Sequence, residues 1–382
     1  MKNTFRNGLF CAASVLTLTM IAPDPAHAQV PGAATGQAFP GRIEEQIRAP
    51  SAMPRVVPSI EVKGVEGRNA PPGAEKVSFI LKSLTLDGVT AYNEADLNTV
   101  YSAKLGQTIT LADLYSIAAD LTRKYRNDGY VLTQIVVPPQ TIEGGTARLH
   151  VVEGYIDRVE VKGDINGMDF IRTIASQIKT GTRAVNIRQL ERSLLLINDL
   201  PGITARGVLN ASKTQAGGAD MVVVVERKPY DAMIGLDNFG TRYLGPLQAT
   251  AVGSLNSLFG VNDKLTAQVV TTPEHDLDNE LYYFGLDYEQ PVWDRGTTLE
   301  VFANKTFTDP GFDLEQFDVH GRSMVKGVRL KHPFIRTRNL NLSGRATFDM
   351  RDVNSANNVE PGREDNIRAL RLGGRFEILD TI

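Results

Sequence analysis

The sequence contains few groups that could support redox, metal or nucleotide chemistry. Its only cysteine is Cys11, and its five histidines are scattered without the spacing of a metal site. No G-x-x-x-x-G-K-[ST] motif is present, so there is no sign of a nucleotide site. The formal net charge is −3, whereas a nucleic-acid-binding domain is normally strongly basic. We therefore expect no catalytic site, metal, cofactor, nucleotide or nucleic acid.

Long apolar runs are also missing after the first residues. Lys2 and Arg6 precede an apolar stretch at 8–22, and an A-x-A sequence ends just before Gln29. This pattern is typical of an export signal peptide, which we place at 1–28. The remaining chain would contain no cysteine, and it has no run of about 18 apolar residues for a membrane helix. If the protein enters a membrane, we expect it to do so as a β-barrel.

A segment rich in Pro, Gly and Ala follows at 29–76. Stretches such as RAPSAMPRVVPS and NAPPGAEK predict an extended linker with polyproline character. Within it, GRIEEQIRA at 41–49 places Ile43 and Ile47 four residues apart on either side of Glu44. This spacing predicts one short helix in the linker.

An internal repeat follows the linker. FILKSLTLDGV (79–89) and YIDRVEVKGDI (155–165) each predict a strand that runs into a glycine turn. Each is followed by a helical pattern of apolar residues and then by two strands. The order β-α-α-β-β therefore predicts two small α+β modules in tandem, at 77–154 and 155–228.

From residue 230 onward, apolar residues recur at every second position. In LNLSGRATFDM (340–350), Leu340 and Phe348 fall on one face of an extended chain, and Arg345 and Asp349 fall on the other. We expect about eight such strands in 230–382, with no helix between them. A soluble β-sandwich and a membrane β-barrel both show this alternation.

Three features favour an antiparallel transmembrane barrel. Most strands are long enough to cross a bilayer when tilted. Short connections near 258–262, 291–296 and 332–339 alternate with longer ones. The short turns carry aromatic residues of the kind found at membrane interfaces, namely Phe259, Trp293 and Phe334. The apolar face would then contact lipid, and the charged face would line a pore. The expected pore-lining residues are Arg345, Asp349, Arg371 and Arg375.

The chain resembles the outer-membrane transporters of two-partner secretion, the TpsB family of ShlB/FhaC/HecB-type haemolysin secretion and activation proteins. Four stretches carry the resemblance: GYVLTQIVVPPQTIEGGTARLHVVEGYIDRVEVKG (129–163), GLDNFGTRYLGPLQ (235–248), YEQPVWDRGTTLEV and LKHPFIRTRNLNL. The resemblance covers about residues 40–382. It implies that the modules are POTRA domains and that the barrel has sixteen strands, of which about eight are present. Since the sequence ends in or just after a strand, we expect the remaining strands and the family's pore-loop motif beyond Ile382.

The resemblance also implies particular roles for some residues. Family members often carry a helix that plugs the pore, and the candidate here is 41–49 with Ile43, Glu44 and Ile47. An unfolded client can add a strand to the edge of a POTRA sheet through main-chain hydrogen bonds. The family points to the second strand of each module. The expected client-binding residues are Leu132, Gln134, Val136, Ile203 and Ala205.

The resulting hypothesis is a non-enzymatic pore in the bacterial outer membrane, with POTRA domains in the periplasm. It would secrete, and in some members activate, a large exoprotein such as a haemolysin, haemagglutinin or adhesin. Its other expected partners are outer-membrane lipid, the barrel-assembly machinery and periplasmic chaperones. The alternatives are a factor that inserts other barrels, a barrel enzyme using His275, Asp276 and Asp278, and a soluble periplasmic interaction protein.

Overall fold

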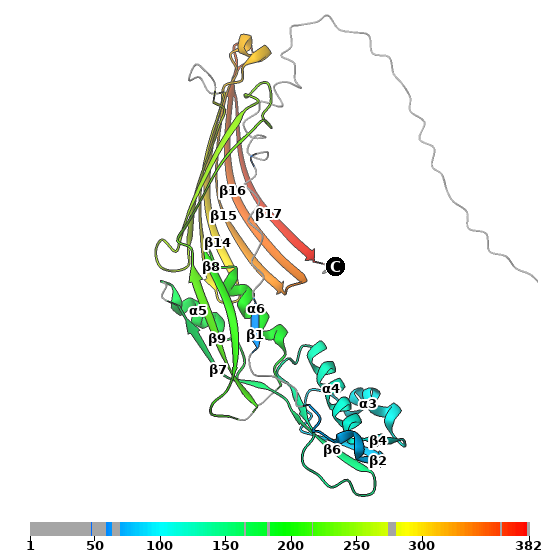
Figure 1. Cartoon of the computed structure of the whole chain (residues 1–382). Coiled ribbons are helices and arrows are strands. Elements are labelled where there is room, and N and C mark those ends of the chain that lie inside the picture. The colour runs from blue at the N-terminus through cyan, green and yellow to red at the C-terminus, as the bar shows by residue number, and fades with distance from the viewer. Residues whose placement is uncertain are drawn as a thin grey trace, which may run out of the picture.

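The computed structural model describes residues 47, 59–62, 69–163, 166–181, 184–215, 217–273, 280–359 and 361–379. The expected signal peptide lies outside these residues, as do Ile43 and Glu44 of the expected plug helix. Two α/β modules lie at one end of an elongated molecule, and a long curved sheet forms the rest (Figure 1).

The first module contains a three-stranded sheet covered by two helices. The strand order is β3-β6-β5, with β3 and β6 parallel and β5 antiparallel to β6. A two-stranded sheet of β2 and β4 lies beside the three-stranded sheet. The elements of the first module are η1 (Ala74–Lys76), β2 (Ser78–Ile80), β3 (Ser83–Asp87), α3 (Glu94–Tyr101), η2 (Ser102–Lys104), β4 (Thr108–Thr110), α4 (Leu111–Asn127), β5 (Gln134–Val136) and β6 (Thr146–Val152).

The second module repeats this arrangement. Its strand order is β7-β9-β8, so the third strand of the module again lies between the first and the second. A short strand from the linker, β1 (Ile60–Val62), adds to β8 in parallel. The other elements are β7 (Tyr155–Lys162), α5 (Met168–Ala175), α6 (Ile187–Asn198), β8 (Ile203–Ala211) and β9 (Gly218–Arg227). The two β-α-α-β-β units expected from the sequence repeat are confirmed.

Eight antiparallel strands form the long sheet, each pairing with the next along the chain. Among the described residues, β10 and β17 each have only one neighbouring strand. A 3-10 helix, η3 (Phe312–Phe317), lies in the connection between β14 and β15. The strands are β10 (Tyr230–Asp237), β11 (Gln248–Asn256), β12 (Lys264–Thr271), β13 (Leu281–Trp293), β14 (Thr297–Thr308), β15 (His320–Arg336), β16 (Leu340–Ala356) and β17 (Arg363–Ile378).

The long sheet has one polar face and one apolar face. Residues opposite one another in neighbouring strands lie on the same face, so the register extends each face across the sheet. The polar face carries Asp287, Glu289, Glu300, Arg329, Lys331, Thr347 and Asp349. The apolar face carries Leu286, Val301, Val328, Leu330, Phe348, Leu370 and Leu372. The side chains of the apolar face are exposed, reaching 79 % at Leu372.

The polar face is the more enclosed of the two, since Glu300 and Asp349 are buried there. Asn304, Arg329, Asp349 and Arg371, from four successive strands, line one cavity on that side. The eight-stranded, barrel-type sheet expected from the alternation is therefore confirmed. Within the described segments, no helix is both long and apolar enough to span a membrane.

Candidate functional site

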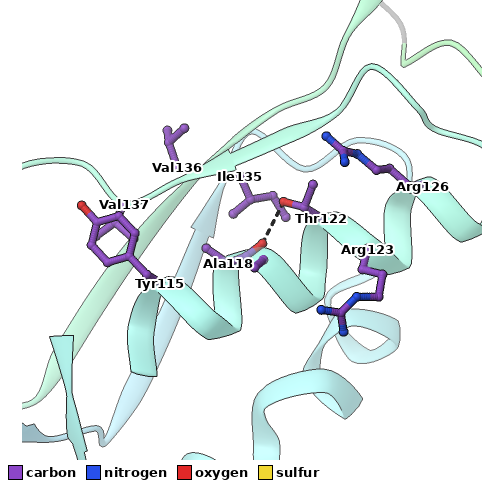
Figure 2. Close-up of a pocket in the computed structure, with 9 residues that line it drawn as sticks. Tyr115, Ala118, Thr122, Arg123, Arg126, Ile135, Val136 and Val137 are labelled. Carbon is purple, nitrogen blue, oxygen red and sulfur yellow. Dashed lines mark hydrogen bonds between the residues drawn. The ribbon is translucent and has the colours of Figure 1, made fainter. Parts of the chain in front are cut away.

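A groove separates α4 from the edge strand β5 in the first module (Figure 2). Its volume is about 250 Å³. The helix contributes small and polar side chains, and the strand contributes apolar ones. The lining residues are Tyr115, Ala118, Ala119, Thr122, Arg123, Arg126, Ile135, Val136 and Val137. The groove thus offers an apolar floor with two arginines from α4 at its rim.

The start of α4 is fixed by a reciprocal capping box. The Thr110 hydroxyl accepts a hydrogen bond from the Asp113 amide (3.1 Å), and the Asp113 carboxylate accepts one from the Thr110 amide (2.8 Å). These bonds from Thr110 hold the pKa of Asp113 below its usual range. Buried residues such as Leu114 and Leu121 attach the opposite side of the helix to the module core. The groove face of α4 is therefore held in a fixed position beside β5.

The strand β5 is an edge strand of the three-stranded sheet. It pairs with β6 on one side only, so its other edge is unpaired by any strand in the described part of the chain. Gln134 and Val136, two of the expected client-binding residues, belong to this strand and are partly buried. Between them, Ile135 is buried and faces α4 (Figure 2). An edge of this kind can pair with an incoming extended chain.

Leu132 does not belong to this edge. The chain makes a turn here, with the Thr133 amide donating to the Tyr130 carbonyl oxygen (3.1 Å), and β5 begins only at Gln134. The side chain of Leu132 packs against the core of the second module and approaches Gly154. The expectation that Leu132 shares the strand edge with Gln134 is wrong, because strand alternation does not extend through a turn.

A carboxylate organises the end of the first module nearest the second. Glu153 accepts hydrogen bonds from the Thr90 amide (3.0 Å), the Ala91 amide (2.9 Å) and the Tyr125 hydroxyl (2.8 Å). Burial by itself would raise the pKa of Glu153, but the hydrogen bonds from Thr90, Ala91 and Tyr125 outweigh it and lower the pKa. Burial and the bond to Glu153 raise the pKa of Tyr125. Glu153 therefore ties α4 to the loop after β3 as a charged group.

The corresponding edge of the second module is partly occupied. The linker strand β1 pairs with β8, placing Ile60 opposite Gly207, and the Gly207 amide donates to the Ser59 carbonyl oxygen (3.0 Å). The expected client-binding residues Ile203 and Ala205 lie earlier in β8, and their side chains are 5 % and 1 % exposed in the module core. Their side chains are thus not available to a client, since they pack inward.

The second module is attached to the long sheet through the short turns. The Arg336 guanidinium makes two bonds to the Asp199 carboxylate (2.7 and 2.8 Å), and Arg338 pairs with Glu191 (2.9 Å). The Asn262 side chain, from the turn between β11 and β12, donates to the Gly167 carbonyl oxygen (2.9 Å). A third turn is held by Gln177, which donates to the Asp294 carbonyl oxygen (3.0 Å). Three turns therefore hold this module beneath the sheet.

The expected pore-lining residues share the polar face of the sheet. Arg345, Asp349 and Arg371 line the same cavity, and Arg375 lies further along β17 on the same face. Asp349 is buried and pairs with Arg371, while Arg375 pairs with Glu377 (2.5 Å). A second group of charges lies on neighbouring strands. It consists of Glu289 and Glu300 paired with Arg329 and Lys331.

The aromatic residues expected at a membrane interface are exposed near the short turns. Phe259, Trp293 and Phe334 all have at least half of their side chains exposed. Ile47, the one described residue of the expected plug helix, contacts the cluster of Leu244, Val270, Leu281 and Tyr283. Val270 and Tyr283 are opposite each other on the polar face. His275, Asp276 and Asp278 lie outside the described residues.

Two family models match the chain. The ShlB-type POTRA domain matches residues 79–154, and the haemolysin secretion/activation protein family ShlB/FhaC/HecB matches residues 217–360. The chain is therefore similar to this family over its first module and most of its long sheet. Its long sheet is thus placed in the bacterial outer membrane and its POTRA modules in the periplasm.

Curated relatives and a solved structure agree with this family assignment. The chain is 24 % identical over 356 residues to the heme/hemopexin transporter protein HuxB of Haemophilus influenzae, covering 91 % of this chain and 62 % of HuxB. It is 25 % identical to the hemolysin transporter protein ShlB of Serratia marcescens, covering 69 % of this chain and 46 % of ShlB. CdiB from Escherichia coli has the same fold, with a TM-score of 0.56, 16 % identity, and coverage of 82 % of this chain and 59 % of CdiB. The chain thus spans less than two thirds of these relatives.

The described residues contain no group of three or more His, Cys, Asp or Glu side chains that could hold a metal ion. The features that sequence reasoning missed are the Arg336–Asp199 attachment and the pairing of β1 with β8. Arg336 and Asp199 are far apart in the sequence and carry no spacing signal. The alternation of Ile60 and Val62 is too short to predict a strand.

Proposed function

We propose that this protein is the outer-membrane pore of a two-partner secretion system and exports a large exoprotein that reaches it unfolded. The observation that carries the proposal is the unpaired edge of β5 beside an apolar groove. The module with this groove is joined to a second module, which is attached to a curved sheet with a charged face. The division into a linker at 29–76, POTRA modules at 77–154 and 155–228, and a barrel from 230 belongs to this proposal.

The captured client segment adds to β5 as an extra strand. Its main chain pairs with the free edge, and alternate side chains enter the groove toward Ile135 and Ala118. Arg123 and Arg126 lie at the rim, where Arg123 also pairs with Asp120 (2.8 Å). The first module is the preferred site, because β1 already covers part of β8 in the second.

Export then needs no nucleotide. The client passes along the polar face, where inward charges such as Arg345 and Asp349 keep the pore hydrated. Folding of the exoprotein outside the cell makes transit irreversible. Arg371 and Arg375 extend the same hydrated surface.

Filling the groove tests the proposal. Ala119→Trp places a large side chain in the groove from an exposed position of α4, and we expect export to fall by about tenfold, since one hot-spot contact is worth about 1–2 kcal/mol. The measurement is the amount of a co-expressed two-partner exoprotein in the medium, with the membrane level of this protein as reference.

Ala95→Trp is the matched control, because Ala95 is also exposed on a helix of the first module but lies outside the groove. Export should stay at the wild-type level. Equal export by Ala119→Trp and wild type would contradict the proposal, as would equal losses in both variants.

A further inference from the structure

The lipid-facing side of β14 to β17 changes from apolar to charged along its length. The charges are basic on β14 and β15, whereas β16 and β17 also carry Asp352 and Glu364 on this face. Following each strand away from the second module, the outward residues are aliphatic or aromatic and then become charged. The last apolar row contains Val301, Val328, Phe348 and Leu370, which are opposite one another in the register. The next positions along the strands, further from the second module, are Lys326 and Arg368, each opposite Met350. The change occurs at the same level on neighbouring strands.

Further cations continue this band. Lys305 of β14 is opposite Met324, and Arg322 is opposite Phe307. Lys305 and Arg322 are therefore diagonal neighbours, as are Lys305 and Lys326, and such positions lie about 7–8 Å apart. Three basic side chains thus form one compact group on the outward face.

These three cations lack protein counterions. Arg368 pairs with Asp352 (2.8 Å) on the same face. Lys305, Arg322 and Lys326 have no carboxylate within ion-pair distance among the described residues, and Lys305 instead lies over the Phe307 ring, 4.7 Å from its centre. Charges on the lipid face of a barrel cost about 2–4 kcal/mol at the bilayer midplane but little near its surface. The group is therefore suited to the headgroup level of the membrane.

An apolar groove runs directly beneath Lys326. Side chains from four strands form its walls, and Lys326 is its only charged lining residue. The lining includes Leu286, Val301, Ala303, Val328, Phe348 and Met350. A groove of this composition on a membrane-facing surface fits a hydrocarbon chain, and the lysine at its rim fits an anionic headgroup.

The orientation of the molecule decides which leaflet supplies the ligand. The second module, on the periplasmic side, contacts the short turns at one end of the sheet. The basic group lies toward the opposite end, near the start of β15 and the end of β14 (Figure 1). It therefore faces the outer leaflet, whose phosphorylated amphiphile is lipopolysaccharide.

We propose that Lys305, Arg322 and Lys326 form a binding site for the phosphates of lipopolysaccharide, with one acyl chain in the groove beneath Lys326. Ammonium and guanidinium groups bind phosphate through charge-assisted hydrogen bonds, which strengthen next to hydrocarbon. The site would fix the depth of this part of the barrel wall in the outer leaflet.

The test compares lipopolysaccharide affinity of the intact protein in phosphatidylcholine nanodiscs. The variant is Lys305→Gln/Arg322→Gln/Lys326→Gln, and we expect its dissociation constant to rise by about fivefold for each cation removed. Dephosphorylated lipopolysaccharide should bind wild type as weakly as intact lipopolysaccharide binds the variant, and inorganic phosphate alone should not compete.

The control Lys162→Gln/Lys179→Gln/Lys213→Gln removes three exposed charges from the second module and should leave affinity unchanged. The charge-retaining variant Lys305→Arg/Arg322→Lys/Lys326→Arg should bind nearly as wild type does, which separates a binding loss from misfolding. Wild-type affinity in the triple glutamine variant would overturn the proposal. Equally tight binding of inorganic phosphate or of dephosphorylated lipopolysaccharide would also overturn it.

Discussion

At the residue scale, single polar groups fix the parts that the sequence repeat alone leaves undefined. Glu153 joins α4 to the loop after β3, and Arg336 joins the barrel wall to the second module. Each is a charged group with several hydrogen-bond partners, so removal of one partner leaves an unsatisfied charge.

Glu153→Gln should destabilise the first module by about 2 kcal/mol at pH 7, because hydrogen bonds to a charged acceptor are lost. The folded-state pKa of Glu153 is lowered, so its stabilisation is present above the unfolded pKa of about 4.3 and is lost as pH falls through the folded value. Thermal melting of the intact protein, followed by tyrosine circular dichroism, should show a lower melting temperature for the variant than for wild type. This difference in melting temperature should shrink as the pH falls through the acidic range. Glu143→Gln, in an exposed loop, serves as control, and a deficit independent of pH would contradict the assignment.

Asp199→Asn should loosen the attachment of the second module, because it leaves the buried Arg336 without its carboxylate partner. We expect tryptic cleavage in the turn at 337–339 to accelerate by about tenfold, corresponding to roughly 1.5 kcal/mol. Asp169→Asn is the matched control, since Asp169 pairs with Arg172 on the exposed surface of the same module. Identical cleavage rates in both variants would show that this ion pair does not hold the turn.

At the element scale, the two modules share a strand order but differ at their edges. β5 is open toward solvent, whereas β8 is paired with a strand from the linker. This difference makes the modules unequal in the proposed capture of a client. It also gives β1 a role that its length alone would not indicate.

Ile60→Gly/Val62→Gly should release β1, because both side chains pack against the core of the second module. Hydrogen exchange of the segment 203–211 should then speed up, starting at the Gly207 amide that donates to Ser59. Exchange in β5, where no linker strand pairs, is the internal control. Unchanged protection at Gly207 would mean that β1 contributes nothing to this edge.

The sequence predicted most elements but not their mutual contacts. Alternation and helical periodicity are local signals, and they located the two modules and the eight strands of the sheet. Leu132 was misplaced because a turn at 130–133 interrupts the alternation. The attachment of Arg336 to Asp199 depends on long-range packing, for which a single sequence carries no periodic signal.

At the scale of the whole molecule, the two faces of the sheet separate lipid from water. The mature chain is expected to lack cysteine, so single introduced cysteines can report on each face. Arg345 and Ala346 are adjacent residues of β16 on opposite faces. Their positions therefore allow a direct comparison within one strand.

Arg345→Cys should react with a water-soluble maleimide at least about tenfold faster than Ala346→Cys, because a thiol needs water to form the reactive thiolate. Labelling is measured on intact outer membranes and repeated in urea, where both cysteines should react alike. Faster labelling of Ala346→Cys would reverse the assignment of the two faces and would contradict a water-filled pore on the polar face.

The attachments described above also make the periplasmic arm stiff. The first module is held to the second by the Ile187 amide, which donates to the Gly129 carbonyl oxygen (2.9 Å), and by the packing of Leu132. The second is held to three turns of the sheet. In the proposed export, a client bound at β5 would therefore span a fixed distance before its next segment reaches the polar face of the sheet. Insertions that lengthen the client between these two segments should then lower the efficiency of export, and longer insertions should lower it more.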